Sequence, residues 1–322
     1  MALATELTKR LQIRHPVLLA PMGAVAGGRL AAAVTRAGGL GLLGPGYFGT
    51  DWIEQQFEAA GNTPVGIGFI TWHMEKHPEQ LETALAHKPR AVMLSFGDPA
   101  PFIPRIKEAG ATVITQVQGV EMARSAAKAG ADIIVAQGGE AGGHGAVRGG
   151  MCLVPAVVDA VAPVPVVAAG GIADGRGLAA ALALGACGAL IGTRFFASEE
   201  ALGVPAAKKR LVEGRGDDTV RTTIFDVVRK IDWPKPFTGR ALTNDFTRRW
   251  HGEEAALATG LEAEHVRYQA AAGKGDVDTV VVWAGEGVDL IHAVEPAEAI
   301  LTRIVAEAEA CLTRTADLVT AG

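Results

Sequence analysis

The glycine-rich loop around His144 is the part of the chain whose residue types best suit chemistry. From Gln137 to Ala146 five of the ten residues are glycine, and His144 lies among them, directly after an apolar run. Glycine lets a backbone lie close against a flat ligand, and imidazole exchanges protons near neutral pH. This loop can therefore hold a titratable group over a bound ring system. A flexible surface loop with an incidental histidine is the alternative.

Two glycine-led turns form the second candidate feature. Gly170-Gly171 follows the apolar run Val164 to Ala169, and Gly192-Thr193 follows the next run, Gly188 to Ile191. Such turns expose backbone N–H groups, and Thr193 adds a hydroxyl, which together suit a phosphate monoester. Barrel enzymes often bind phosphate at the ends of their last two strands. Taken singly, each turn is also explained as ordinary strand termination.

Two weaker features lie at other strand ends. Ala20, Pro21 and Met22 follow the first apolar run, where their backbone groups can meet the polar edge of a ring. Gln116, at the end of the fifth run, carries an amide that can reach a ribityl chain or a phosphate. His73 follows the third run and is a candidate for the pocket wall.

Eight apolar runs are the elements that must position these residues. A predicted helix that ends in Ala-Gly or Gly-Ala precedes four of the runs. Glycine there permits a left-handed helix cap before the chain turns into a strand. Runs without polar alternation indicate strands that are buried on both faces. Eight alternating βα units predict a (βα)8 barrel in preference to an open doubly wound sheet. The runs are Pro16 to Ala20, Leu40 to Leu43, Val65 to Ile70, Ala91 to Ser95, Thr112 to Thr115, Asp132 to Ala136, Val164 to Ala169 and Gly188 to Ile191.

The alternation of predicted strands and helices ends at about Glu200. The stretch from Ala201 to Gly287 is charged and mostly helical in pattern, so we expect a helical cap over the barrel mouth. An amphipathic segment from Pro296 to Leu318 is expected to pack back on the barrel. The predicted units are a barrel over 1–210, a cap over 211–289 and a closing helix over 290–322. Possible pocket walls are Trp72, Phe96, Phe237 and Trp250.

Composition excludes several classes of protein. The net charge of -5 provides no broad basic surface for nucleic acid or anionic lipid. No apolar run approaches the roughly 20 residues that span a bilayer, and the N-terminus lacks a secretory signal. Three cysteines without CxxC spacing indicate reduced thiols in a cytoplasmic protein without zinc, and no His and carboxylate pair has metal-ligand spacing. The sequence allows a homodimer.

Together these motifs resemble the nitronate monooxygenase family, formerly called 2-nitropropane dioxygenases. The resemblance extends over nearly the whole chain, and the glycine-rich loop with its histidine is its most specific part. The motifs that carry it are Ala20-Pro21-Met22, Ala37 to Gly41, Gln137 to Gly145, Ala169 to Gly175, Gly192 to Phe195 and Trp283 to Gly287.

The resemblance implies an FMN-dependent barrel enzyme that oxidises alkyl nitronates with O2, giving a carbonyl compound and nitrite. It implies that His144 is the catalytic residue. Many relatives have an asparagine near the flavin where this chain has Gly66 to Phe69, so the chain departs from the family pattern at that contact. FMN contacts implied by the resemblance are Ala20, Pro21, Met22, Gln116, Gly138, Gly143, Gly170, Gly171, Gly192 and Thr193.

Two rival functions remain at this point. The same barrel also serves FMN-dependent NAD(P)H:quinone reductases and enoyl-thioester reductases, and fold alone does not separate them from a monooxygenase. A barrel that binds a sugar phosphate without redox chemistry is the third possibility. Such enzymes usually need a lysine or a carboxylate at a strand end, and no residue is convincingly placed for it.

Overall fold

The computed structural model describes residues 3–318 and contains a barrel of eight parallel strands, which confirms the predicted (βα)8 fold. Neighbouring strands pair in the order β1-β9-β8-β6-β5-β4-β3-β2. The ring closes where Leu18 bridges Leu40, with the Leu40 N–H donating to the Val17 carbonyl at 3.1 Å. The strands are β1 (Val17–Leu19), β2 (Leu42–Leu43), β3 (Gly66–Ile70), β4 (Ala91–Ser95), β5 (Thr112–Val117), β6 (Ile133–Gln137), β8 (Val166–Ala169) and β9 (Ala189–Ile191).

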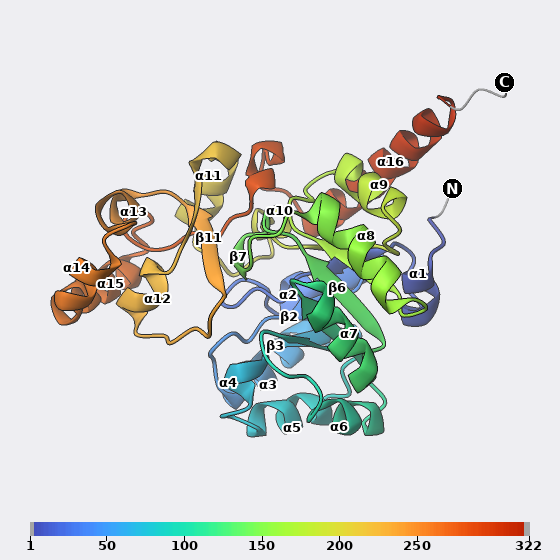
Figure 1. Ribbon diagram of the computed structural model, residues 1–322, viewed down its shortest axis with the longest axis horizontal. Helices are drawn as coiled ribbons and strands as arrows, with labels where there is room; N and C mark the ends of the chain where they lie inside the picture. Colours follow the sequence, from blue (N-terminus) through green and yellow to red (C-terminus); the bar gives the residue numbers. More distant parts are fainter. Residues whose placement is uncertain (1–2, 319–322) are drawn as a thin grey trace.

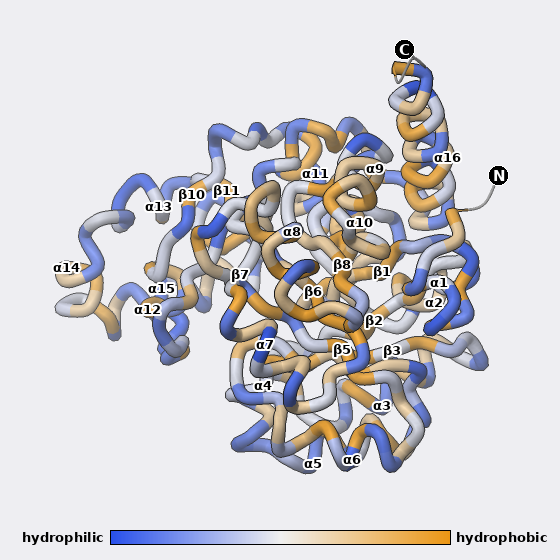
Figure 2. Tube along the Cα trace, turned by 45° about the vertical axis from the view of Figure 1, so that its right-hand side comes forward, coloured by the Kyte–Doolittle hydropathy of each residue, from blue (hydrophilic) through white to orange (hydrophobic). Residues whose placement is uncertain are grey.

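The barrel strands are apolar throughout because both of their faces are buried. In β1, Leu18 packs into the barrel interior, whereas Val17 and Leu19 pack outward against the helices. The helix α1 (Glu6–Leu11) closes the bottom of the barrel, and its Leu7 and Leu11 join the interior cluster. Figure 2 shows hydrophobic residues concentrated around the barrel strands, with hydrophilic residues mainly on the outer helices and the cap.

Eight helices surround the barrel, and the last of them is the C-terminal helix. After β9 the chain leaves the barrel and returns as α16, which packs against α9 and α2 and so occupies the eighth place (Figure 1). Residues 1–2 and 319–322, the ends of the expected first and last units, lie outside the described residues. The surrounding helices are α2 (Gly28–Arg36), α3 (Thr50–Ala60), α5 (Glu79–Ala86), α6 (Ile103–Glu108), α7 (Val120–Ala129), α8 (Gly150–Val161), α9 (Gly175–Ala183) and α16 (Ala297–Ala316).

The segment between β9 and α16 forms a body beside the barrel mouth, with its own apolar cluster built on Ile224, Phe225 and Tyr268 (Figure 1). Its helices were expected, but its sheet was not. In that sheet β10 (Thr219–Thr222) pairs with β11 (Thr238–Leu242), and β11 pairs antiparallel with β7 (Gly143–Gly145) of the glycine-rich loop. The helices of this body are α11 (Pro205–Glu213), α12 (Ile224–Arg229), α13 (Asp245–Trp250), α14 (Glu254–Thr259) and α15 (Leu261–Lys274).

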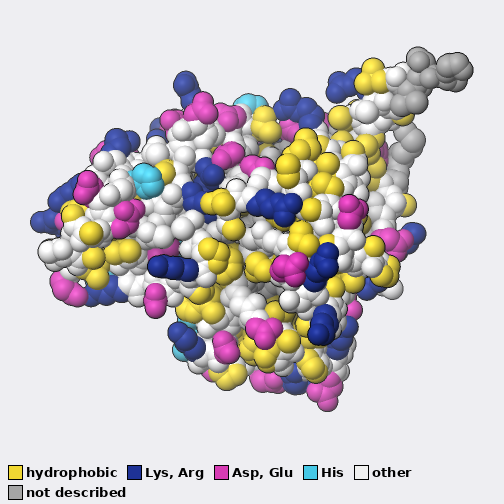
Figure 3. Space-filling model, viewed as in Figure 1, with side chains coloured by type: hydrophobic (Ala, Val, Ile, Leu, Met, Phe, Trp, Pro, Cys, Tyr) yellow, Lys and Arg dark blue, Asp and Glu magenta, His cyan; other side chains and the backbone are white. Residues whose placement is uncertain are grey.

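The surface carries charges of both signs. The face in Figure 3 mixes lysine and arginine with aspartate and glutamate between patches of hydrophobic side chains. No helix within residues 3–318 combines the length and apolar character that crossing a membrane requires. Among the same residues, no three His, Cys, Asp or Glu side chains are grouped so that they could hold a metal ion.

Candidate active site

A cavity of about 500 Å³ opens at the carboxyl ends of the barrel strands. Its size is within the range of small-molecule and cofactor sites. Ten of the eleven residues predicted from the sequence line it, although they come from strands far apart in the chain. These ten are Ala20, Pro21, Met22, Gln116, Gly143, His144, Gly170, Gly171, Gly192 and Thr193.

Gly138 is the predicted residue that does not line the cavity. Its N–H donates to the Ala169 carbonyl at 2.8 Å, which extends the pairing of β6 with β8. A Cβ atom here would lie 2.2 Å from Glu140 Oε2 and 2.8 Å from the Gly150 nitrogen. Glycine is needed at this position because the Gly150 backbone and the Glu140 carboxylate approach closely.

The two glycine-led turns lie side by side at one wall of the cavity. Gly170 and Gly171 have φ values of 102° and 70°, which are conformations that side chains disfavour. Among the described residues, neither the Gly171 N–H nor the Gly192 N–H has a hydrogen-bond acceptor. The Thr193 hydroxyl accepts a hydrogen bond from the Gly285 N–H at 3.0 Å and keeps its own proton for another acceptor. The turns thus present unpaired donors to one region of the cavity.

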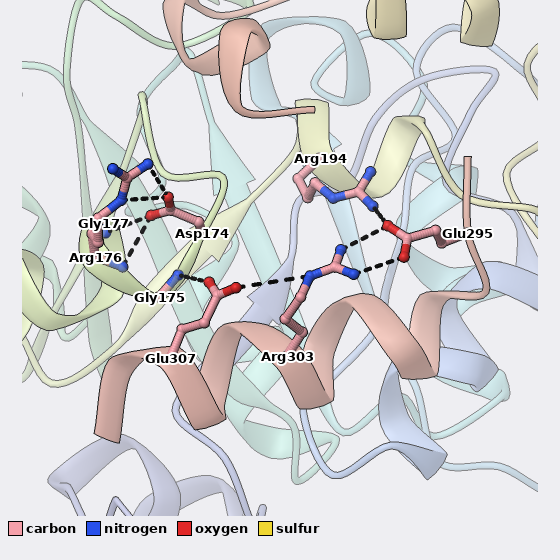
Figure 4. A network of polar contacts seen from close by, with 8 residues as sticks. All are labelled: Asp174, Gly175, Arg176, Gly177, Arg194, Glu295, Arg303 and Glu307. Atoms are coloured by element: carbon pink, nitrogen blue, oxygen red, sulfur yellow. Dashed lines mark hydrogen bonds and ion pairs between the residues drawn. The ribbon is translucent and has the colours of Figure 1, made fainter. Parts of the chain in front are cut away.

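A network of ion pairs lies behind these turns and ties them to α16 (Figure 4). Arg194, directly after Thr193, is buried and pairs with Glu295, which Arg303 of α16 also binds through both carboxylate oxygens. Burial is the main cause that lowers the pKa of Arg194, and Glu295 opposes it. Glu307 of α16 accepts a hydrogen bond from the Gly175 N–H at 3.0 Å. The two glycine-led turns are therefore held in place by α16.

The cavity suits a flat ring carrying a phosphorylated tail. The turns provide a cradle of backbone donors. A Cβ at Gly170 would approach the Gly138 oxygen and the Ala141 nitrogen at 3.1 Å, so the turn has no room for a side chain there. Apolar groups, including Pro21 and Met22, provide a surface for a ring. A flavin mononucleotide has these two parts, so the residues present fit it.

Three buried glutamines connect the carboxyl ends of β5 and β6 to the glycine-rich loop. Gln137 Oε1 accepts hydrogen bonds from Gln118 Nε2 at 2.8 Å and from Gln116 Nε2 at 3.3 Å. Gln137 Nε2 can then donate to the His144 carbonyl at 3.0 Å. Sequence reasoning identified Gln116 but not Gln137, although both lie at the carboxyl ends of their strands and both line the cavity. The available signal was that two successive strands carry a polar residue at their carboxyl ends.

His144 itself is held by the cap. Its backbone pairs with Gly239 of β11, and its ring stacks on Trp233 with centroids 3.5 Å apart and an angle of 6° between planes. His144 Nε2 lies 2.9 Å from Asp226 Oδ2 of α12. Burial is the main cause that lowers the pKa of His144, and the hydrogen bond to Asp226 partly offsets it. This environment therefore favours the neutral form of the imidazole.

Two arginines of the cap sheet hold the rest of the loop. Arg221 of β10 donates to the Gly139 carbonyl at 3.0 Å, and Arg240 of β11 donates to the same oxygen at 3.1 Å. Burial, followed by repulsion from Arg240, lowers the pKa of Arg221 to about 10. Because both cations satisfy carbonyls of the loop, the glycine-rich segment is ordered by the cap.

Aromatic side chains surround the cavity mouth. Tyr47, Phe96, Trp233 and Trp283 line it, and Trp233 Nε1 donates to the Tyr47 hydroxyl at 2.7 Å. Of the predicted walls, only Phe96 lines the cavity. Trp72 and Phe237 pack behind Trp233 and Phe96, and His73 packs on Tyr47. The last predicted wall, Trp250, lies against the core of the cap and not at the cavity.

Comparison with protein families agrees with the site. The family model described as nitronate monooxygenase matches residues 4–75 and 69–307. The chain belongs to the nitronate monooxygenase family. It is therefore an oxidoreductase, and its family consists of flavin-dependent enzymes, which confirms the resemblance noted in the sequence.

Individual relatives differ in their stated activities. A nitronate monooxygenase, npaC, of Metarhizium robertsii is 35% identical over 92% of each chain. A (3aS,4S,5R,7aS)-5-hydroxy-7a-methyl-1-oxo-octahydro-1H-indene-4-carboxyl-CoA dehydrogenase of Mycobacterium tuberculosis is 39% identical over 70% of this chain and 65% of its own length. The solved structure of FabK from Thermotoga maritima superposes with a TM-score of 0.88, at 32% identity, over 98% of this chain and 99% of that one.

Proposed function

We propose that the chain binds FMN and oxidises alkyl nitronates with O2 to a carbonyl compound and nitrite. Two nitronate anions and one O2 give two carbonyl compounds and two nitrite ions, so atoms and charge balance. The observation that carries the proposal is a buried His144, held by Asp226 at 2.9 Å, in the lining of a cavity that unpaired backbone donors also line.

In this proposal the chain's residues hold the cofactor by its phosphate. The donors are the N–H groups of Gly171 and Gly192 and the hydroxyl of Thr193, with Arg194 behind them. Gln116 and the backbone around Met22 would meet the polar edge of the ring. The bound flavin supplies the electron acceptor, and the protein supplies orientation and charge.

His144 determines which form of the substrate can be used. A neutral imidazole has a lone pair that can accept the α-proton of a nitroalkane, which converts it into the nitronate inside the cavity. Arg229, which lines the cavity, adds a positive charge near the resulting anion. The surrounding aromatic rings exclude water from the reacting groups. A nitroalkane is thus a second substrate class for the same site.

An anaerobic titration tests this function. The purified protein is first tested for a flavin absorption band and released FMN, and then titrated with ethylnitronate and, separately, with NADH. We expect bleaching by the nitronate and nitrite formation once O2 is admitted. Rapid bleaching by NADH together with no response to the nitronate would overturn the proposal.

That second outcome corresponds to the rival function, an FMN-dependent NAD(P)H:quinone or enoyl-thioester reductase. The 39% identity to a dehydrogenase of a CoA thioester favours it. A CoA thioester or quinone that reoxidises NADH-reduced enzyme faster than O2 would establish the reductase. The same preparation therefore decides between both functions.

A further inference from the structure

Asp226 is a buried carboxylate whose only direct polar partner among the described residues is His144. Its side chain is 5% exposed, and its Oδ2 lies 2.9 Å from His144 Nε2. The other oxygen, Oδ1, is buried without a hydrogen-bond partner among the described residues. Burying a carboxylate with so few hydrogen bonds is costly. The charge of Asp226 therefore acts most directly on His144.

Other titratable groups near this pair make no hydrogen bond to either side chain. Arg221 of β10 and Arg229 of α12 face His144, and both lower its pKa. Tyr47 and Tyr268 face Asp226 from the 45–48 loop and from α15, but their hydroxyl oxygens accept hydrogen bonds from Trp233 and Val281. Within residues 3–318, Asp226 alone is placed to select which nitrogen of His144 carries the proton.

We infer that Asp226 is a positioning residue, which keeps the proton of His144 on Nε2 and leaves Nδ1 as the nitrogen that meets the substrate. This inference rests on the proposed function. The carboxylate accepts the Nε2–H, so the lone pair resides on Nδ1, which has no partner among the described residues. A carboxylate that orients a catalytic imidazole in this way contributes strongly to turnover.

The proton transfer then balances. The α-carbon of a nitroalkane gives its proton to Nδ1, and the electron pair of the C–H bond moves onto the nitro group to form the nitronate. In the imidazolium that results, the Nε2–H still donates its hydrogen bond to Asp226. The negative charge of Asp226 stabilises the cation. Asp226 matters for a nitroalkane, which must lose a proton, and matters far less for a nitronate, which has already lost it.

The first test is nuclear magnetic resonance of the ¹⁵N-labelled imidazoles, which needs no turnover. Resonances of His144 are assigned by their loss in His144→Asn. We expect Nε2 to be protonated and Nδ1 unprotonated at neutral pH in the native protein. In Asp226→Leu we expect a redistribution of the proton between the two nitrogens. A native imidazole protonated on Nδ1, or a tautomer unaffected by Asp226→Leu, would refute the inference.

The second test compares two substrates in Asp226→Asn, which keeps the size of the side chain. We expect kcat/KM for nitroethane to fall roughly 100-fold, because the base His144 loses the negative charge that orients it and stabilises its cation, while kcat/KM for ethylnitronate changes little. The acid limb of the nitroethane pH profile should move to lower pH, because the lost negative charge no longer raises the pKa of His144. Equal losses on both substrates, or no loss on either, would count against the positioning role.

The matched control is Asp232→Asn, which removes an exposed carboxylate six residues along the same cap segment. It should leave the tautomer, the pH profile and both rates unchanged. Melting temperature and flavin content establish that each variant is folded and loaded. If the native enzyme uses neither substrate, the proposed function fails, but the imidazole tautomer still decides the role of Asp226.

Discussion

At the scale of single residues, the site depends on a histidine whose environment opposes its charge. Burial among Trp233, Trp283 and the glycine-rich loop lowers the pKa of His144, and the Asp226 carboxylate offsets part of that effect. A neutral imidazole can take a proton from a carbon acid, whereas an imidazolium cannot. The buried setting therefore favours a base over a fixed positive charge.

His144→Asn should retain flavin and lose turnover. Asparagine keeps a polar side chain in the loop but has no basic nitrogen, so kcat/KM for nitroethane should fall about 10²- to 10⁴-fold. Stopped-flow flavin bleaching measures the rate, and the flavin absorbance ratio measures loading. Unchanged rates in a fully loaded variant would remove His144 from the chemistry.

The pH dependence has a definite sign. The active form is the neutral imidazole, so kcat/KM for a nitroalkane should rise with pH and level off above the pKa of His144. Because that pKa is below its ordinary value of 6.5, the enzyme should stay active at pH 6.5 and lose activity only in more acidic solution. An acid limb centred above 6.5 would show that the imidazole is charged in the resting enzyme.

At the scale of elements, the site is built from glycine-led turns whose N–H groups the flanking structure leaves unpaired. Asp174 caps α9 by accepting hydrogen bonds from the Arg176 and Gly177 N–H groups, which starts the helix directly after the Gly170-Gly171 turn. Both glycines have positive φ, so the chain reverses without a side chain entering the cavity. The unpaired N–H groups then remain available to a phosphate.

Gly171→Ala should weaken FMN binding more than it weakens the fold. Alanine at φ 70° costs about 1–2 kcal/mol in backbone strain. The control is Gly110→Ala, at φ 79° in the turn after α6, where a Cβ meets nothing within 4 Å. Both variants should unfold at lower denaturant concentration, but only Gly171→Ala should raise the Kd for FMN, by about tenfold for each 1.4 kcal/mol lost at the site. Equal FMN affinity in the two variants would show that this turn does not bind the phosphate.

At the scale of the whole molecule, the sequence predicts the barrel better than it predicts the site. Strands buried on both faces are continuous apolar runs, so all eight were recognisable. The cap sheet was not, since β7 is Gly-His-Gly and forms only by pairing with β11. Asp226 lies 82 residues from His144, and no local spacing indicates that α12 brings it there. Trp233 was missed for the same reason.

The C-terminal helix is a second whole-molecule feature, and its close packing can be tested. A Cβ at Gly175 of α9 would lie 2.3 Å from the Ala308 nitrogen of α16. Gly175→Val should therefore destabilise the protein by about 1–3 kcal/mol, as overpacking does. Ala180→Val, on the exposed face of α9, is the control. Thermal unfolding measures both, and equal melting temperatures would show that α16 does not pack tightly at this position.

The place of α16 between α9 and α2 also has a consequence for biosynthesis. A ribosome releases the first seven βα units and the cap before it makes the helix that completes the ring. Until then, the apolar groove that receives Ile300, Leu301 and Ile304 stays open to water. Nascent chains of this architecture therefore expose an apolar, aggregation-prone surface late in translation, when binding by chaperones is most useful. Chains truncated before residue 297 should aggregate, even when the residues that line the cavity are unchanged.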